Sequence, residues 1–188
     1  MSRKTYIINL IGGPCCGKTT MCALLFAQLK LNGYIIEYVQ EYAKHLVWTK
    51  DFETLNNQYY VTRTQYKLFK QINGNVDLII TDGTILHGLY YNRYNIDNTS
   101  NVDKTQKLII DCYNEFNNIN IFLQRGNFKY EQEGRIESES ESMKIDVILK
   151  ESLDKFNIPF VIFDSSTNQI ESIIDYIQQA INSTNNIN

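Results

Sequence analysis

The amino-acid sequence predicts an α/β fold, in which a five-stranded parallel sheet is covered by helices on both faces. Short apolar runs alternate along the chain with longer stretches of helical periodicity. The short runs are mostly apolar at both alternating sets of positions, which is typical of parallel strands that lie buried between two layers of helices. A length of 188 residues fits one such domain.

The predicted strands occupy residues 6–11, 34–39, 76–81, 119–123 and 159–163. The third run is apolar apart from Asp77, which we interpret as a turn or strand-start residue, and its last residue, Thr81. Because ligands bind beyond the carboxyl ends of parallel strands, the residues that follow each strand are the first candidates for function.

Helices are predicted between these strands, because apolar residues recur there every three or four positions. The first has Met21, Leu24, Leu25 and Leu29 on one face and ends at Gly33. The others are expected at residues 55–72, 108–116, 145–153 and 170–181. We expect a single domain over residues 1–181, followed by a disordered, Asn-rich tail over residues 182–188.

Composition argues against several classes of protein. The net charge of -3 is the opposite of the basic footprint that nucleic-acid binding usually leaves. No run approaches the roughly 20 apolar residues of a membrane span, so we expect no membrane contact. The four cysteines lack the paired spacing of a zinc site, which favours free thiols in a reducing cytoplasm, that of the host if the chain is viral. The oligomeric state is left open.

A phosphate-binding loop is the strongest motif in the sequence. Residues 12–19 satisfy GxxxxGK[ST] between the first strand and the first helix, where backbone N–H groups can surround phosphate oxygens. Lys18 is expected at the β- and γ-phosphates, and the Thr19 hydroxyl on Mg²⁺. The predicted nucleotide-binding residues are Gly12, Gly13, Pro14, Cys15, Cys16, Gly17, Lys18, Thr19 and Thr20. The motif alone does not separate a kinase from another nucleotidase, and the absence of NKxD favours ATP over GTP.

Acidic residues follow the second and third strands. Glu41 comes after residue 39 and is a candidate to accept the proton of an attacking hydroxyl or to hold a sugar hydroxyl. Asp82 follows the third strand and is a candidate for the Mg²⁺ shell or the acceptor, with Gly83 leaving room for a ligand. The alternatives are a solvated acid or a charge at a helix N-terminus for Glu41, and a helix cap for Asp82. We interpret His45 and His87 as packed or surface residues.

A polar, glycine-punctuated segment follows the fourth strand. Arg125 and Arg135, helped by Lys129, are candidates to close over the transferring phosphate as part of a mobile lid. The alternative is a solvated loop with incidental arginines. The acidic residues 137–142 are expected to start a helix.

Together these residues resemble the NadR-like P-loop family of AAA-like domains, which is common in bacteria and phages and is known for ribosylnicotinamide kinase activity. The resemblance covers most of residues 5–180 and rests on residues 12–20, 41–44, 81–82, 122–125 and 130–135. It implies a P-loop kinase fold and ATP with Mg²⁺ as cofactors. By this resemblance Lys18 and Thr19 are ATP–Mg²⁺ residues, Glu41 and Asp82 are acceptor and metal residues, and Arg125 and Arg135 are lid residues.

Three hypotheses for function follow. The leading one is an ATP-dependent kinase of a small nucleoside- or nucleotide-like acceptor such as ribosylnicotinamide. The second is a kinase of hydroxymethylated bases in DNA, and the third is a regulatory P-loop ATPase that acts as a switch. Among the thirteen tyrosines, the candidates to stack on a base are Tyr59, Tyr66, Tyr90, Tyr91 and Tyr94.

Overall fold

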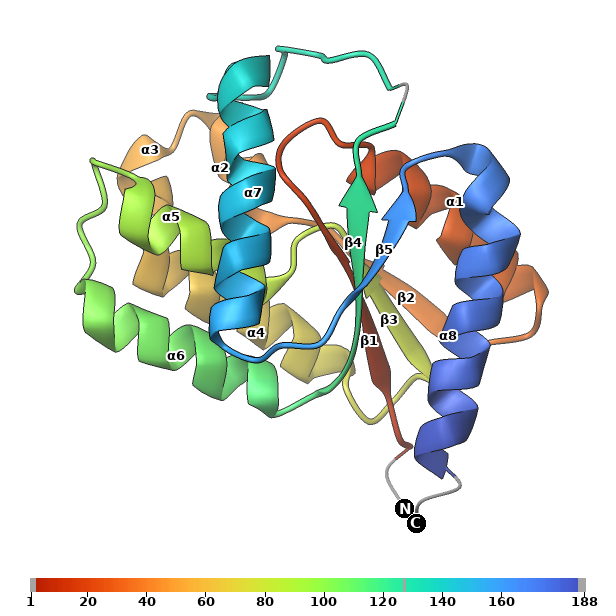
Figure 1. Ribbon diagram of the computed structural model, residues 1–188. Coiled ribbons are helices and arrows are strands. Elements are labelled where there is room, and N and C mark those ends of the chain that lie inside the picture. The colour runs from red at the N-terminus through yellow and green to blue at the C-terminus, as the bar shows by residue number, and fades with distance from the viewer. Residues whose placement is uncertain (1–2, 127, 186–188) are drawn as a thin grey trace.

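Parallel strands form one central sheet in the computed structural model, which describes residues 3–126 and 128–185. Within these residues the sheet has five strands in the order β2-β3-β1-β4-β5 (Figure 1). The strands are β1 (Tyr6–Ile11), β2 (Ile36–Val39), β3 (Leu78–Thr81), β4 (Asn117–Gln124) and β5 (Val161–Asp164). The predicted fold class is therefore confirmed.

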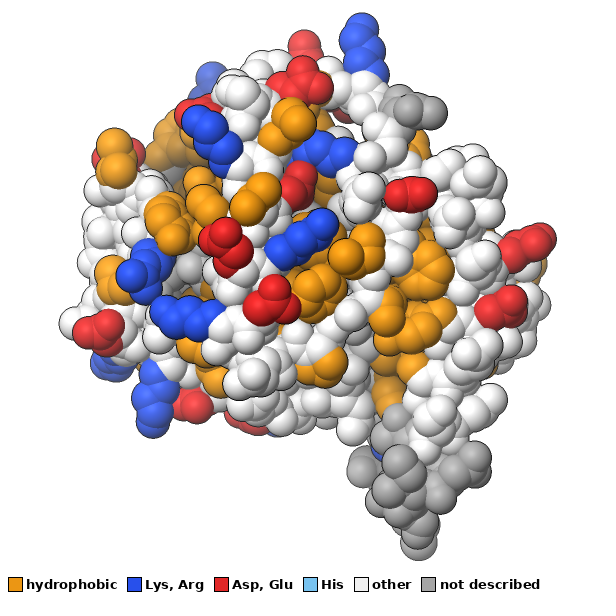
Figure 2. Space-filling view, in the orientation of Figure 1, with side chains coloured by type: hydrophobic (Ala, Val, Ile, Leu, Met, Phe, Trp, Pro, Cys, Tyr) orange, Lys and Arg blue, Asp and Glu red, His pale blue; other side chains and the backbone are white. Residues whose placement is uncertain are grey.

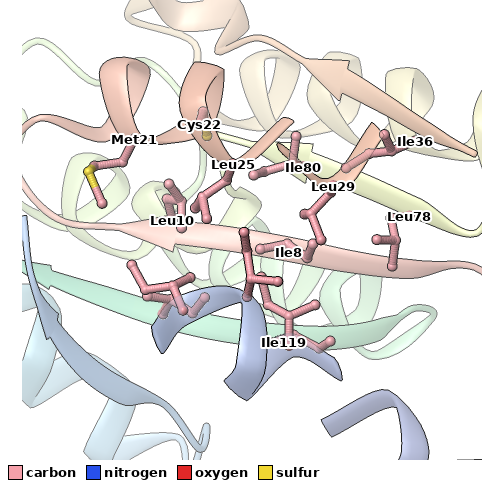
Figure 3. Packing of buried hydrophobic residues seen from close by; sticks show 14 of the residues in the cluster. Ile8, Leu10, Met21, Cys22, Leu25, Leu29, Ile36, Leu78, Ile80 and Ile119 are labelled. Carbon is pink, nitrogen blue, oxygen red and sulfur yellow. The ribbon is translucent and has the colours of Figure 1, made fainter. Parts of the chain in front are cut away.

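One face of the sheet is covered by α1 (Lys18–Leu31) and α8 (Ile170–Asn185) (Figure 1). Alternate residues of β1, such as Ile8 and Leu10, pack with Leu25 and Leu29 of α1 (Figure 3). Because successive strand residues point to opposite faces, Ile7 and Ile11 of the same strand belong to the core on the other side.

The other face is covered by α4 (Gln58–Ile72), α5 (Gly88–Tyr94), α6 (Val102–Asn114) and α7 (Glu139–Lys155). Figure 1 shows these helices together on one side of the sheet. Two short helices, α2 (Tyr42–Thr49) and α3 (Phe52–Leu55), follow β2. The 3-10 turns η1 (Ile85–His87) and η2 (Thr167–Gln169) precede α5 and α8.

Four strands, β2, β3, β4 and β5, start two residues from the predicted position. The chain at residue 35 is held by Asp77, whose carboxylate accepts from the Ile35 N–H at 2.9 Å, so the regular ladder of β2 and β3 begins only after these residues. At β4 the ladder instead extends two residues earlier, to Asn117. Pro159 has no N–H to donate to a ladder, and β5 begins at Val161.

Asparagine caps explain why α4 and α6 start at other residues than the sequence predicted. The predicted helix over residues 55–72 is divided, because the Asn57 side chain accepts from the Tyr60 N–H at 3.0 Å and starts α4, which leaves Leu55 in α3. Asn101 caps α6 in the same way, several residues before the predicted start. The helices α2, α3 and α5 were not predicted, since they are too short to carry a clear apolar period.

The predicted helix start in the acidic segment is confirmed by a capping box at α7. The Ser138 hydroxyl accepts from the Glu141 N–H, and the Glu141 carboxylate accepts from the Ser138 N–H at 2.8 Å. At the other end of the chain, α8 continues to Asn185, so residues 182–185 of the expected tail are helical, and residues 186–188 lie outside the described residues. In the described part of the chain, no helix is long and apolar enough to cross a membrane.

Candidate functional site

The phosphate loop joins β1 to α1 at the carboxyl end of the sheet. Gly17 caps α1 with a φ of 90° and without a side-chain hydrogen bond, so the first N–H groups of the helix remain available to an anion. A Cβ at Gly17 would collide with the Ser165 hydroxyl and the Phe128 ring. The loop therefore depends on glycine both for its backbone conformation and for space.

Lys18 is folded over this loop. Its Nζ donates to the carbonyl oxygens of Gly12 at 2.7 Å and Gly13 at 2.8 Å, and the side chain is only 9% exposed. A buried ammonium in this position places a positive charge where phosphate oxygens would enter the loop. The role of Lys18 at the β- and γ-phosphates stays a prediction.

Residues after three different strands meet next to the loop. The Thr19 hydroxyl donates to Asp82 Oδ2 at 2.6 Å, and the Glu41 N–H donates to Asp82 Oδ1 at 3.2 Å. Glycine at position 83 allows the backbone of Glu41 to lie this close to Asp82, because a Cβ on residue 83 would overlap the Glu41 Cα. The structure thus brings together the threonine and both acids that the sequence singled out.

The pair of Thr19 and Asp82 fits a Mg²⁺ site that a nucleotide would complete. Among residues 3–126 and 128–185, no group of three or more His, Cys, Asp or Glu could hold a metal by itself. Mg²⁺ binds through few protein ligands and takes the remainder from water and phosphate oxygens. A hydroxyl and a carboxylate beside a phosphate loop are suited to that coordination.

Glu41 has the electrostatic environment of a general base. Burial raises the pKa of its carboxyl to about 7, opposed by the charge of Lys18 and helped by that of Asp82. The charges of Arg135 and Lys44 also lower this pKa, by less than that of Lys18. A carboxylate with a pKa near neutrality can accept a proton in one step and release it in the next.

Two further polar groups are buried near the site: Tyr38, which the sequence analysis did not consider, and His87, which is packed as that analysis allowed. The Tyr38 hydroxyl is buried near Asp82, and burial, then the Asp82 charge, raises its pKa. His87 Nε2 is buried without a hydrogen-bond partner among the described residues, and burial together with the Lys18 charge keeps the pKa of the imidazole low. Tyr38 is the last but one residue of β2, and this place near the carboxyl end of a strand was the signal available in the sequence.

The two predicted lid arginines occupy different places. Residues 128–138 arch over the sheet edge where β4 ends (Figure 1), and Arg135 lines the cavity beneath them. Arg125 does not line this cavity; its Nε pairs with Asp146 of α7 at 2.5 Å. Lys129 is part of the lining. Of the proposed lid cations, the structure therefore places Lys129 and Arg135 at the cavity.

The cavity has a volume of about 730 Å³ and extends from the phosphate loop to α2, α3 and α5. Tyr90, Tyr91 and Tyr94 of α5, three of the five candidate tyrosines, line it. Tyr59 and Tyr66 do not belong to its described lining, so they do not support a stacking role. Its size suits a small ligand next to a bound triphosphate.

Comparisons with known proteins agree with this description of the fold. The model of a protein family described as "AAA domain" matches residues 7–169. No curated protein matches. A solved structure of deoxyadenosine kinase from M. mycoides, described with products dCMP and a flexible dCDP bound, is similar at 19% identity and a TM-score of 0.59, over 92% of this chain and 99% of that one. The crystal structure of APE1195 is similar at 14% identity and a TM-score of 0.48, over 97% and 96% of the two chains.

Proposed function

The chain belongs to the protein family described as "AAA domain", and on that premise we propose that it is an ATP-dependent kinase of a small, nucleoside-like acceptor. One observation carries the proposal: a single cavity is lined by the phosphate loop, by three tyrosines of α5 and by Glu41, whose charge acts on both Lys18 and Tyr91. A kinase needs a donor site, a base and an acceptor site close together, because phosphoryl transfer depends mainly on positioning and charge.

The donor half of the cavity would hold ATP and Mg²⁺. Lys18 and the N–H groups at the start of α1 bind the phosphates, while Thr19 and Asp82 hold the metal. When bound, Mg²⁺·ATP supplies the phosphoryl group and a divalent charge beside it. Asp82 is 2% exposed and already hydrogen-bonded to Thr19, so both side chains are oriented before the ligand enters.

Glu41 acts on the acceptor. Its carboxylate accepts the proton of the acceptor hydroxyl as that oxygen bonds to the γ-phosphorus, and the bond from the γ-phosphorus to the bridging oxygen breaks to leave ADP. The products are ADP and a phosphate monoester, and the proton then leaves Glu41 for solvent. The alternatives that we left open for Glu41, holding a sugar hydroxyl, a solvated acid or a charge at a helix N-terminus, predict no such proton transfer.

Arg135 stabilises the charge that develops on the transferring group. It lines the cavity, and its guanidinium is near enough to affect the pKa of Glu41. We expect Arg135→Ala to lower kcat by about 10²-fold while changing ATP affinity much less, since the interaction strengthens in the transition state. Arg93→Ala, on the exposed part of α5, is the matched control. Loss of ATP affinity with unchanged kcat at saturation would instead make Arg135 a ground-state clamp.

The acceptor half favours a ring that is neutral or positively charged. Tyr90 and Tyr94 stack with ring centroids 5.3 Å apart, and Tyr91 meets Tyr90 edge-on at 5.1 Å. Burial, and after it the charge of Glu137, raises the pKa of Tyr90 and Tyr91, so a carboxylate lies beside these rings. Tyrosine faces and a carboxylate attract a cationic ring. Ribosylnicotinamide, whose pyridinium is cationic, is therefore our first candidate acceptor.

Polymeric DNA fits this surface less well. The net charge is -3, and Figure 2 shows acidic and basic side chains interspersed over the face that carries α7. A groove that tracks a phosphate backbone would instead gather Lys and Arg. The solved protein of similar fold is a deoxyadenosine kinase, a kinase of a small nucleoside, which supports a small-molecule acceptor.

A panel of acceptors with γ-labelled ATP tests the choice of substrate. It contains ribosylnicotinamide, nucleosides, nucleotides and duplex DNA with hydroxymethyluracil, each over a range of salt concentrations. We expect label on a small acceptor, most efficiently on ribosylnicotinamide, with a weak dependence on salt. Transfer to DNA alone, falling steeply with salt as counterion release requires, would overturn the small-molecule proposal.

A further inference from the structure

A network of side chains outside the cavity holds the first half of the phosphate loop. Asp146 Oδ1 accepts from the Gly13 N–H at 2.6 Å, and Asp146 Oδ2 accepts from Arg125 Nε at 2.5 Å. Arg125 Nη2 also donates to the carbonyl and hydroxyl oxygens of Ser142, and the Ser142 hydroxyl donates to the Pro14 carbonyl. We call Arg125, Ser142 and Asp146 the loop clamp.

The loop clamp connects three elements that are distant in sequence. Ser142 and Asp146 are one turn apart on α7, so they face the loop together, and Arg125 follows the end of β4. The charged pair is mostly buried, with 21% of the Arg125 side chain and 16% of Asp146 exposed. Removing one partner would leave a buried charge unpaired, which disfavours the observed arrangement strongly.

The identity of Gly13 gives an independent indication that the loop clamp matters. This position of the GxxxxGK[ST] motif accepts any residue, and yet it is glycine here. A Cβ on Gly13 would lie 2.6 Å from the Ser142 carbonyl oxygen, 2.9 Å from Arg125 Nη2 and 3.0 Å from Asp146 Oδ1. The loop clamp packs directly on the loop backbone, and only glycine leaves it that space.

We propose that Arg125, Ser142 and Asp146 are positioning residues that hold the phosphate loop in its nucleotide-binding shape, and that Arg125 acts through the loop and not by touching the transferring phosphate. The part about transfer rests on the proposed kinase function, whereas the part about the loop does not. Arg125 lies outside the cavity lining and its donors are directed to Asp146 and Ser142. Because α7 directly follows the lid loop, the clamp also links the lid to the phosphate loop.

A double-mutant cycle between Arg125 and Asp146 tests this role. Equilibrium binding of Mg²⁺·ADP is measured for Arg125→Gln, Asp146→Asn and the double variant, which requires no phosphoryl transfer. We expect each single variant to bind about tenfold more weakly, as loss of a hydrogen bond to a charged group implies, and the double variant to be no weaker than the worse single one. Asp111→Asn, which breaks the exposed Lys107–Asp111 pair on α6, is the control and should bind normally.

A kinetic measurement separates the two roles of Arg125. If it acts through the loop, Arg125→Gln and Asp146→Asn raise the KM for ATP by similar factors and leave kcat at saturation within about threefold. Additive losses in the cycle, or a kcat loss of about 10²-fold for Arg125→Gln alone at unchanged affinity, would assign Arg125 to the phosphate and overturn the proposal. Should the charge variants fold poorly, Ser142→Ala and Gly13→Ala perturb the same contacts, and normal Mg²⁺·ADP affinity in both would equally overturn it.

Discussion

We expect Lys18→Ala to lose about 10³-fold or more of its ATP turnover. The Lys18 ammonium is buried against the carbonyl oxygens of Gly12 and Gly13, in the position where phosphate charge would enter the loop. Without it, the charge that develops on the transferring phosphoryl group loses its nearest cation in a poorly solvated site. ADP release at saturating ATP and acceptor is the measurement.

The control for this variant is Lys30→Ala, because Lys30 lies on the same helix in its last turn and away from the loop. It should keep wild-type turnover. Wild-type turnover in Lys18→Ala, with that variant folded as judged by its melting temperature, would contradict a kinase mechanism built on this loop.

Glu41→Gln should lower kcat by about 10²-fold to 10³-fold and leave ATP affinity nearly unchanged, since the amide keeps the size of the side chain but cannot accept the proton. The matched control is Glu37→Gln, four residues earlier on the exposed side of β2. Nucleotide affinity and turnover are measured separately. Unchanged turnover would mean that Glu41 does not act as the base.

The pH dependence adds a second test of the same residue. With its pKa raised to about 7, Glu41 is protonated below that pH and cannot accept a proton, so kcat should rise with pH through about 7 and then level off. Glu41→Gln should remove this limb of the profile. A limb of the same midpoint in the variant would assign the titration to another group.

As pH rises, the free energy of unfolding should fall while kcat increases. The folded pKa of Glu41 lies above its ordinary value of 4.5, so between pH 4.5 and about 7 the folded chain binds more protons than the unfolded chain. The free energy of unfolding therefore falls as pH rises through this window. Above it, Glu41→Gln should melt at a higher temperature than wild type, while at low pH the difference should disappear.

The sheet could be predicted from sequence because its strands are short, mostly apolar runs, a local pattern that does not depend on where the strand lies in the fold. Strand and helix ends depended on individual polar contacts. The carboxylate of Asp77 holds residue 35 outside the ladder, and Asn57 divides the helix that one apolar period suggested. Hydrophobic periodicity does not reveal such hydrogen bonds, because it records only which residues are apolar.

The candidate site followed from two rules, the phosphate-loop pattern and the position of acids just after strands. Both apply to Glu41 and Asp82, and the structure places them in contact with each other and beside Thr19. The partner of Arg125 could not be predicted in this way. An arginine after a strand suits a phosphate and a carboxylate equally, and Asp146 lies 21 residues further on, within a helix.

The fate of the γ-phosphoryl group tests the central claim most directly. ATP labelled at the γ-position is incubated with the wild-type chain and with Lys18→Ala, with and without the small nucleoside-like acceptors, and ADP, inorganic phosphate and phosphorylated acceptor are quantified. A kinase of a small molecule predicts that wild type forms one labelled acceptor for each ADP, and that Lys18→Ala forms almost none. Label recovered only as inorganic phosphate, at a rate that no small acceptor changes, would contradict this account and indicate an ATPase.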